Sequence, residues 1–390
     1  MSETVGASGA KKADMRVVHV VGAMDRAGTE TMIMNLYRAM DRDRIQFDFI
    51  VHEDRLCDYD EEIADLGGVI RRIPRFVGAN LLEYAKASRA VLASFADDPV
   101  VHGHIGSCAA IYLNEAKKMH KAAIAHSHAQ NYPLSLEQVA FRAVSFPTRF
   151  VADEFLACSR QAGIDRFGAK VAASDHFHVL PNGIDVDRYH CTDKDHERAK
   201  VALGLGNGPI VGHVGRLAEI KNHAFLFEVF VEMLRRAPAA QLVLYGKGEL
   251  EEQLRSLAEA LGLGERVHFR GLTDDVPSAL KAMDVMVFPS FKEGLAMALI
   301  EAQATGMPCV FSDGVPGEVA LSEAAVRLPL SDGAAEWAQT ALALGEKSRD
   351  RSCGSALVRS AGFDVASSAE WLAGFYGKLA EGALCGRIGS

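Results

Sequence analysis

The sequence of 390 residues lacks the cysteine patterns that build disulfide frameworks and zinc sites. Its seven cysteines are scattered, and no two form a CxxC pair, which favours free thiols in a reducing compartment. No stretch of about 18 uncharged, apolar residues occurs, so no helix is expected to span a membrane. Residues 1–14 also lack the apolar segment of a signal peptide. We therefore expect a cytoplasmic location for this chain.

An excess of basic charge is absent as well. The 42 Lys and Arg residues are outnumbered by 51 Asp and Glu residues, and the net charge of −9 argues against general binding of nucleic acid. Hydrophobic residues make up 49% of the chain, which is enough to bury a large core and excludes a largely disordered protein. This length suits two domains, because compact domains cluster near roughly 100–200 residues.

Both halves of the sequence alternate apolar runs of strand length with helical patterns, which is typical of βαβ units on a parallel sheet. In the first half strands are expected at residues 16–21, 47–51, 100–104, 123–126, 155–158 and 177–180. In the second half they are expected at residues 210–214, 241–245, 266–269, 284–288, 308–311 and 325–328. The predicted fold class is therefore α/β, with two doubly wound parallel sheets.

The two predicted domains meet in residues 181–195, which contain Pro, Asn, Gly and four Asp residues. We expect a flexible tail at residues 1–14, a first domain at 15–185 and a second at 186–362. A final helical segment at 363–385 carries a wide apolar stripe that needs a surface, and we expect it to pack back on the first domain. The stripe consists of Trp371, Leu372, Phe375, Tyr376 and Leu379.

Two glutamates, Glu293 and Glu301, flank a predicted helix start. Glu293 falls in the loop after strand 284–288, because Pro289 and Gly294 disfavour an earlier helix. Glu301 lies nearly two turns into that helix. Ligands of doubly wound sheets bind at this edge, so both carboxylates can accept hydrogen bonds from a sugar. The alternative is that Glu293 is a helix N-terminal charge and Glu301 a solvated residue.

Two cations, Arg216 and Lys221, lie in the loop after the predicted strand 210–214. Gly215 turns the chain there, and a helix follows. A guanidinium and an ammonium beside a helix N-terminus suit the binding of a diphosphate. The alternative is an ordinary solvated loop with two surface cations.

The first βα turn contains Gly22 and Gly28 but does not have the GxGxxG spacing of a dinucleotide fingerprint. A glycine beside a helix start lets the backbone approach a ligand closely. The alternative is a glycine that only serves the turn.

Four histidines occur as two HxH pairs, His102 with His104 and His126 with His128. Since residues i and i+2 of a strand share a face, four imidazoles could surround a metal ion. No carboxylate or cysteine accompanies them at ligand spacing. We therefore expect no metal, and instead a role for one of these histidines in a ligand cleft.

Taken together, these segments resemble the retaining glycosyltransferases of family 4, and the resemblance covers nearly all of residues 15–385. The Glu-x7-Glu motif of that family corresponds to Glu293 and Glu301, and its basic pair to Arg216 and Lys221. The other matching segments are Ala27–Glu30, Pro181–Asp185 and Gly246–Gly248. Two departures, Ala27 for a glycine and Ala296 for a proline, remove no charged group.

The resemblance implies a GT-B architecture, in which two Rossmann-like domains face each other across a cleft. A UDP- or GDP-linked sugar would bind mainly on the second domain, where Arg216 and Lys221 would hold its diphosphate. Glu301 would accept hydrogen bonds from the ribose, and Glu293 would contact the transferred sugar. Further implied binding positions are Gly28, Gly246, Arg270, Leu272, Gly294 and Leu295. The family pattern favours His128 as the cleft histidine, with His126 as the close alternative.

The resemblance also implies transfer with retention of configuration, no metal or other cofactor, and a part in surface polysaccharide assembly. The acceptor would be a glycan or a sugar linked to a polyprenyl diphosphate. Cations clustered in the N-terminal half favour a peripheral contact with the inner face of the membrane, and the alternative is a solvated basic face. These cations are Arg71, Arg72, Arg75, Lys117, Lys118 and Lys121.

Two other functions fit parts of this pattern. A sugar-nucleotide epimerase with the GT-B fold would bind the same donor, but it would need acid and base residues around the sugar and no acceptor. A catalytically silent partner subunit of another glycosyltransferase would have lost its phosphate-binding residues, which are intact here. The basic pair together with the two glutamates favours transfer.

Overall fold

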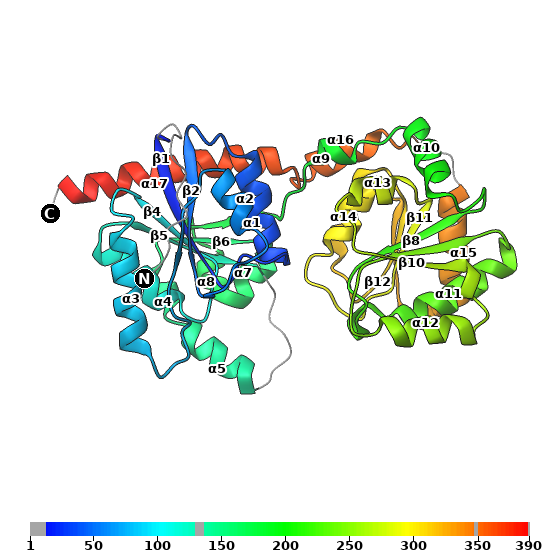
Figure 1. Cartoon of the computed structure of the whole chain (residues 1–390), viewed down its shortest axis with the longest axis horizontal. Coiled ribbons are helices and arrows are strands. Elements are labelled where there is room, and N and C mark those ends of the chain that lie inside the picture. Colours follow the sequence, from blue (N-terminus) through cyan, green and yellow to red (C-terminus); the bar gives the residue numbers. More distant parts are fainter. Residues whose placement is uncertain (1–12, 129–135, 347–349, 389–390) are drawn as a thin grey trace. The chain divides into compact units, whose positions relative to one another are not determined.

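The computed structural model describes residues 13–128, 136–346 and 350–388, and Figure 1 shows their helices and strands. The chain divides into two compact domains. The first contains the chain up to Gly183 and the segment from Val365 onward, and the second contains Ile184–Asp364. Six cysteines are free thiols: Cys353 is exposed, and Cys57, Cys108, Cys158, Cys191 and Cys309 are buried.

A parallel sheet forms the centre of the first domain, in the strand order β3-β2-β1-β4-β5-β6-β7. The order reverses between β1 and β4, because the chain runs outward through β2 and β3 and then returns to the other side of β1. These strands are β1 (Met15–Val21), β2 (Ile45–Val51), β3 (Ile70–Arg72), β4 (Val100–Gly103), β5 (Ala122–Ser127), β6 (Glu154–Ala157) and β7 (Phe177–Val179).

The strands of this sheet agree with the predicted runs to within about two residues, except for β3. Strand β2 is buried along its whole length, as expected for a parallel sheet covered on both faces. Strand β3 was not predicted, because a three-residue edge strand with two arginines has no apolar run to recognise.

Helices cover both faces of the first sheet (Figure 1). The C-terminal helix α17 contributes the fully buried side chains of Leu372 and Tyr376 to the same core as Ile33 and Phe47. The helices of this domain are α1 (Gly28–Ala39), α2 (Asp60–Asp65), α3 (Leu81–Ala93), α4 (Ala109–Lys118), α5 (Leu136–Ser145), α6 (Thr148–Val151), α7 (Arg160–Phe167), α8 (Ala169–Ala172) and α17 (Val365–Ile388).

The second domain has its own parallel sheet, in the order β10-β9-β8-β11-β12-β13, which reverses between β8 and β11. Every predicted strand of this half is present, with ends that shift by two residues or fewer. These strands are β8 (Ile210–Val214), β9 (Gln241–Tyr245), β10 (Val267–Gly271), β11 (Val285–Phe288), β12 (Cys309–Ser312) and β13 (Ala325–Leu328).

The helices of the second domain connect these strands as in a doubly wound fold. The α-helices are α9 (Val186–Tyr189), α10 (Asp193–Leu203), α11 (His223–Arg236), α12 (Glu251–Ala260), α13 (Val276–Lys281), α14 (Met297–Ala304), α15 (Gly333–Glu346) and α16 (Cys353–Ser360). Short 3-10 turns are η1 (Glu219–Lys221), η2 (Gly264–Arg266), η3 (Gly317–Val319) and η4 (Leu330–Asp332). Within the described ranges, no helix has the length and apolar character needed to cross a bilayer.

Candidate active site

The loop after β8 carries both predicted cations to the point where the order of the second sheet reverses. Arg216 is exposed, and Lys221 ends the turn η1. Asn222 then adopts a left-handed conformation with φ 55°, and α11 begins at the next residue. Because β8 and β11 are neighbours here, the loops that follow them flank the crevice in which doubly wound folds bind ligands.

Glu293, in the loop after β11, forms an ion pair with Lys221. The Lys221 Nζ lies 2.8 Å from the Glu293 Oε1, and only about 16% and 15% of the two side chains are exposed. The same ammonium lies 4.6 Å from the centre of the Phe288 ring. A backbone hydrogen bond of 2.9 Å from Phe291 N–H to the Ile220 carbonyl joins the two loops. The ammonium and the carboxylate are therefore held in place at the crevice before any ligand binds.

Glu301 lies in the second turn of α14 and is half-buried, so it is not the solvated residue of the alternative interpretation. Burial raises the pKa of its carboxyl group to about 7, although a 3.0 Å hydrogen bond from the Tyr189 hydroxyl opposes this shift. Near neutral pH the carboxyl group is therefore close to half ionised. It can gain a second donor when a ligand with hydroxyl groups binds.

Gly246 supports the basic loop from the neighbouring strand β9. Its φ is 142°, and a Cβ atom there would overlap the carbonyl oxygen of Gly215. The two loops are joined by hydrogen bonds from Gly215 N–H to the Tyr245 carbonyl at 2.9 Å and from Leu217 N–H to the Lys247 carbonyl at 3.1 Å. A glycine is required here so that the two backbones can approach each other.

The remaining predicted residues of the second domain lie near the same edge of the sheet. Arg270 and Leu272 are exposed at the carboxyl end of the edge strand β10, which lies beyond β9. Gly294 is exposed, and its Cα faces open space. Leu295 is partly buried and packs its side chain against the core.

A cavity of about 300 Å³ lies in the first domain, where the order of its sheet reverses. It is lined by the ends of β1, β4 and β5, by the first turn of α1 and by residues of α4, α5, α6 and α7, among them Arg166. The polar side chains and glycines that line it include Gly22, Thr29, Glu30, His104, His126 and His128. Burial raises the pKa of the Glu30 carboxyl group. The two domains therefore each have predicted residues at a reversal point.

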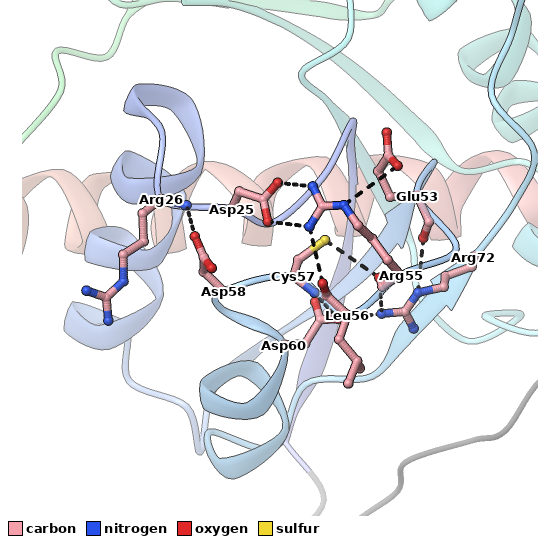
Figure 2. A network of polar contacts seen from close by, with 9 residues as sticks. All are labelled: Asp25, Arg26, Glu53, Arg55, Leu56, Cys57, Asp58, Asp60 and Arg72. Atoms are coloured by element: carbon pink, nitrogen blue, oxygen red, sulfur yellow. Dashed lines mark hydrogen bonds and ion pairs between the residues drawn. The ribbon is translucent and has the colours of Figure 1, made fainter. Parts of the chain in front are cut away.

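The loop between β1 and α1 is held by the loop that follows β2 (Figure 2). The carboxylate of Asp25 pairs with the Arg55 guanidinium, and the Arg26 N–H donates to Asp58 Oδ2 at 2.9 Å. Gly28 is the first residue of α1, and a Cβ there would meet no atom within 4 Å. The space beside this helix start is therefore open, as backbone binding of a ligand requires.

Five imidazoles form two hydrogen-bonded rows at the end of the first sheet. In one row His102 Nε2 lies 3.1 Å from His126 Nδ1, and His102 Nδ1 lies 2.6 Å from the Tyr376 hydroxyl. In the other, His104 Nε2 lies 3.0 Å from His19 Nδ1, and His104 Nδ1 lies 2.7 Å from His128 Nε2. The predicted pairs therefore do share a face, and β1 adds a fifth ring.

Burial lowers the pKa of all five histidines, to about 3 for His19 and His128 and well below the ordinary value for the others. The rings are neutral at pH 7 and offer nitrogen lone pairs. Two triads have nitrogens within 4.8 Å of one another: His19, His102 and His104, and His104, His126 and His128. A metal ion could use either triad only by replacing hydrogen bonds that already join the rings.

Sequence reasoning missed three side chains of these sites: His19, Tyr189 and Tyr376. His19 is the one strongly polar group in the apolar run of β1 after Arg16, and this interruption was an available signal. Tyr376 stood in the predicted apolar stripe, where nothing distinguishes a core tyrosine from one that touches a histidine. Tyr189 has no local signal.

Within the first domain, acceptors contact Lys121 and three further cations of the predicted basic cluster. Lys121 is only 3% exposed, and its ammonium donates to backbone carbonyls, including those of Phe95 and Asp98. The other three form ion pairs: Lys117 with Asp153, Lys118 with Glu115 and Arg72 with Asp60. The Lys118–Glu115 pair joins residues three apart in α4 and is visible in local spacing, whereas Asp153 and Asp60 lie outside the elements of the cations that they pair with.

Comparison with known proteins agrees with this arrangement. Residues 26–188 match the family described as Glycosyltransferase Family 4, and residues 208–347 match Glycosyl transferases group 1. A protein of Bacillus subtilis named as glycosyltransferase EpsF is 34% identical over 347 residues, which is 86% of this chain and 90% of that protein. The chain belongs to glycosyltransferase family 4.

Other relatives of this family 4 glycosyltransferase match over part of the chain or in fold. An Escherichia coli enzyme, UDP-Gal:alpha-D-GlcNAc-diphosphoundecaprenol alpha-1,3-galactosyltransferase, is 34% identical over 35% of this chain and 36% of its own length. The crystal structure of Anabaena HepE in complex with UDP has a TM-score of 0.75 at 18% identity, covering 93% of this chain and all of that one. The fold is GT-B, with two Rossmann-like domains.

Proposed function

We propose that this glycosyltransferase moves a sugar from a UDP- or GDP-linked donor, with retention of configuration and without a metal ion, in surface polysaccharide assembly. The observation that carries the proposal is the pair of Lys221 and Glu293 at the reversal point of the second domain. A cation and a carboxylate held together there suit a diphosphate and the sugar attached to it.

The proposed roles follow from these positions. Arg216 and Lys221 bind the donor diphosphate and stabilise the charge that develops on it as it leaves. Glu301 accepts hydrogen bonds from the ribose, and Glu293 contacts the transferred sugar. The cleft histidine, His128 or His126, faces the reacting sugar. The binding positions Gly28, Gly246, Arg270, Leu272, Gly294 and Leu295 border the donor.

In the proposed reaction a hydroxyl oxygen of the acceptor forms a bond to the anomeric carbon while the bond from that carbon to the phosphate oxygen breaks. The acceptor's proton passes to the departing phosphate, so no protein nucleophile is required. The two cations take the place that a metal ion has in other transferases, because the planar guanidinium and the ammonium are both positively charged near neutral pH and donate hydrogen bonds to phosphate oxygens. The rate of sugar transfer is therefore expected to depend on Arg216 and Lys221.

The relatives support the choice of substrates. HepE was crystallised with UDP and with UDP-glucose, which favours a uridine nucleotide within the proposal. The name of the E. coli relative describes a diphosphoundecaprenol-linked acceptor, which favours a polyprenyl-diphosphate-linked sugar over a free glycan. The resemblance to EpsF supports a part in polysaccharide assembly.

Because the proposed acceptor is linked to a lipid, the proposal includes a peripheral contact of the protein with the inner face of the membrane. That contact does not rest on Lys117, Lys118 or Arg72, which are ion-paired. Co-sedimentation with anionic vesicles that contain a polyprenyl-diphosphate sugar tests it. Binding that equals the value for vesicles without this lipid would contradict an acceptor-directed contact.

The donor site is tested by Arg216→Ala and Lys221→Ala, assayed with labelled UDP- and GDP-sugars. Each variant should lose about 100-fold or more in turnover, because charge stabilisation at the leaving diphosphate is removed. Arg235→Ala is the matched control, since it removes an exposed arginine of α11 whose ion pair is with Glu232 one turn away. Wild-type turnover of either test variant at saturating donor would refute the diphosphate site.

The two glutamates are separated by calorimetry with the bare nucleoside diphosphate. Glu301→Gln should weaken its binding, whereas Glu293→Gln should affect mainly the binding of the intact nucleotide sugar. Equal losses for the two variants would contradict this division of roles.

A further inference from the structure

Tyr376 connects the C-terminal helix to the cavity of the first domain through His102. Its side chain is fully buried, and its hydroxyl lies 2.6 Å from His102 Nδ1. In the described part of the chain this hydroxyl has no second hydrogen-bond partner. The two residues are 274 positions apart in the sequence, so α17 is placed to act on a strand end that is remote along the chain.

The direction of this hydrogen bond follows from what each atom can do. Burial keeps the pKa of Tyr376 well above its ordinary value, so the phenol retains its proton. A buried O–H without an acceptor is costlier than an unused lone pair, so the hydroxyl donates to His102 Nδ1. A neutral imidazole has one proton, and that of His102 must therefore be on Nε2.

The same argument applies to the next ring in this row, His126. His102 Nε2–H donates to His126 Nδ1 across 3.1 Å, which leaves the single proton of His126 on its own Nε2. The Nε2 atom is buried and has no hydrogen-bond partner among the described residues. His126 lines the cavity that also contains Gly22, Glu30 and His128.

We propose that Tyr376, acting through His102, holds His126 in the Nε2–H tautomer, so that His126 donates a hydrogen bond to a sugar or phosphate oxygen in this cavity. The identity of that oxygen rests on the proposed function, whereas the tautomer does not. Tyr376 and His102 are positioning residues, and His126 is the group that contacts the substrate.

The second row of imidazoles shows why the tyrosine matters. His19, His104 and His128 are joined in the same way, but no hydroxyl side chain ends this row among the described residues. Its outer nitrogens, His19 Nε2 and His128 Nδ1, are both without a partner there, so either direction of donation is allowed. Only the row that ends at His126 has a fixed direction.

The tautomer is measured directly by two-bond ¹H–¹⁵N correlation NMR of the full chain labelled with ¹⁵N-histidine. The His126 signals are assigned by their loss in His126→Gln. In the wild type His126 should carry its proton on Nε2, and in Tyr376→Phe a second population protonated on Nδ1 should appear. An Nδ1–H tautomer in the wild type, or identical spectra for the wild type and Tyr376→Phe, would overturn the proposal.

Tyr37→Phe is the matched control, because Tyr37 is equally buried in the same core and donates to Gln46 Oε1 at 2.9 Å. Tyr37→Phe should leave the histidine tautomers unchanged. If it changes them as much as Tyr376→Phe does, the tautomer change comes from general loosening of the core. That result would also overturn the proposal.

Transfer assays test the donated hydrogen bond. His126→Ala should lose about 100-fold in kcat/KM, whereas His126→Gln, whose amide N–H reaches the same position, should lose less than about tenfold. Equal losses in both variants would refute the donor role. A wild type that transfers no sugar would instead refute the proposed function, and the tautomer result would stand independently.

Discussion

Replacing Glu301 by glutamine should remove a pH-dependent weakness of the second domain. The folded carboxyl group has a pKa of about 7 against an ordinary value of 4.5, because burial disfavours its charged form. Below pH 4.5 the group is protonated whether the domain is folded or not, and it has no effect. Between pH 4.5 and 7 the unfolded chain releases the proton while the folded domain retains it, so stability falls as pH rises. Above pH 7 the loss is constant.

The magnitude follows from the two pKa values. Each pH unit between them is equivalent to about 1.4 kcal/mol, so the fully ionised group costs the folded domain about 3 kcal/mol. Glutamine keeps the acceptor for the Tyr189 hydroxyl and cannot ionise. Between pH 5 and pH 8.5 the variant should therefore gain about 2–3 kcal/mol relative to the wild type.

Urea unfolding at the two pH values measures this difference. The chain has two tryptophans, and Trp337 is fully buried in the second domain, so a Trp371→Phe background makes fluorescence report on that domain alone. Glu219→Gln, which removes an exposed carboxylate of the same domain, is the control. A stability difference between Glu301→Gln and its parent that is equal at both pH values would refute the reasoning.

Two further substitutions test the packing that supports the sites. Gly246→Ala should destabilise the second domain by more than about 1 kcal/mol and weaken nucleotide binding, because the new Cβ overlaps Gly215. The control is Gly262→Ala, where φ is 70° and the space around the Cα is open. This variant should leave nucleotide binding unchanged in calorimetry. Leu372→Ala should cost the first domain about 2–5 kcal/mol in urea unfolding followed by Trp371 fluorescence, and a matching loss in the second domain would contradict the assignment of α17 to the first.

Most of the fold could be predicted because its signals are local. A buried parallel strand has a short run of apolar residues as its sequence pattern. The loops that follow parallel strands meet at one edge of the sheet. Arg216, Lys221 and Glu293 were therefore placed in the correct loops without any knowledge of their contacts. Strand β3 was missed because its three residues, Ile70–Arg72, contain too little apolar sequence to form such a run.

The charge state of the sites was not predictable in the same way. Desolvation depends on what covers a group, so the raised pKa of Glu301 and the low pKa of His128 appear only when the neighbouring elements are packed. The partners of the basic cluster were not predictable for the same reason. Lys117 meets Asp153 and Lys121 reaches backbone carbonyls from outside its own segment, and local spacing contains neither contact.

Local sequence predicts every described strand except β3 and places Arg216, Lys221 and Glu293 in loops that follow strands, because an apolar run and a turn involve only neighbouring residues. Tertiary structure alone decided which side chains touch. Lys221 meets Glu293 across 72 positions, and Tyr376 meets His102 across 274. Such contacts depend on strand order and on the face of the sheet that a distant helix covers. Neither can be predicted from the local pattern of apolar and polar residues.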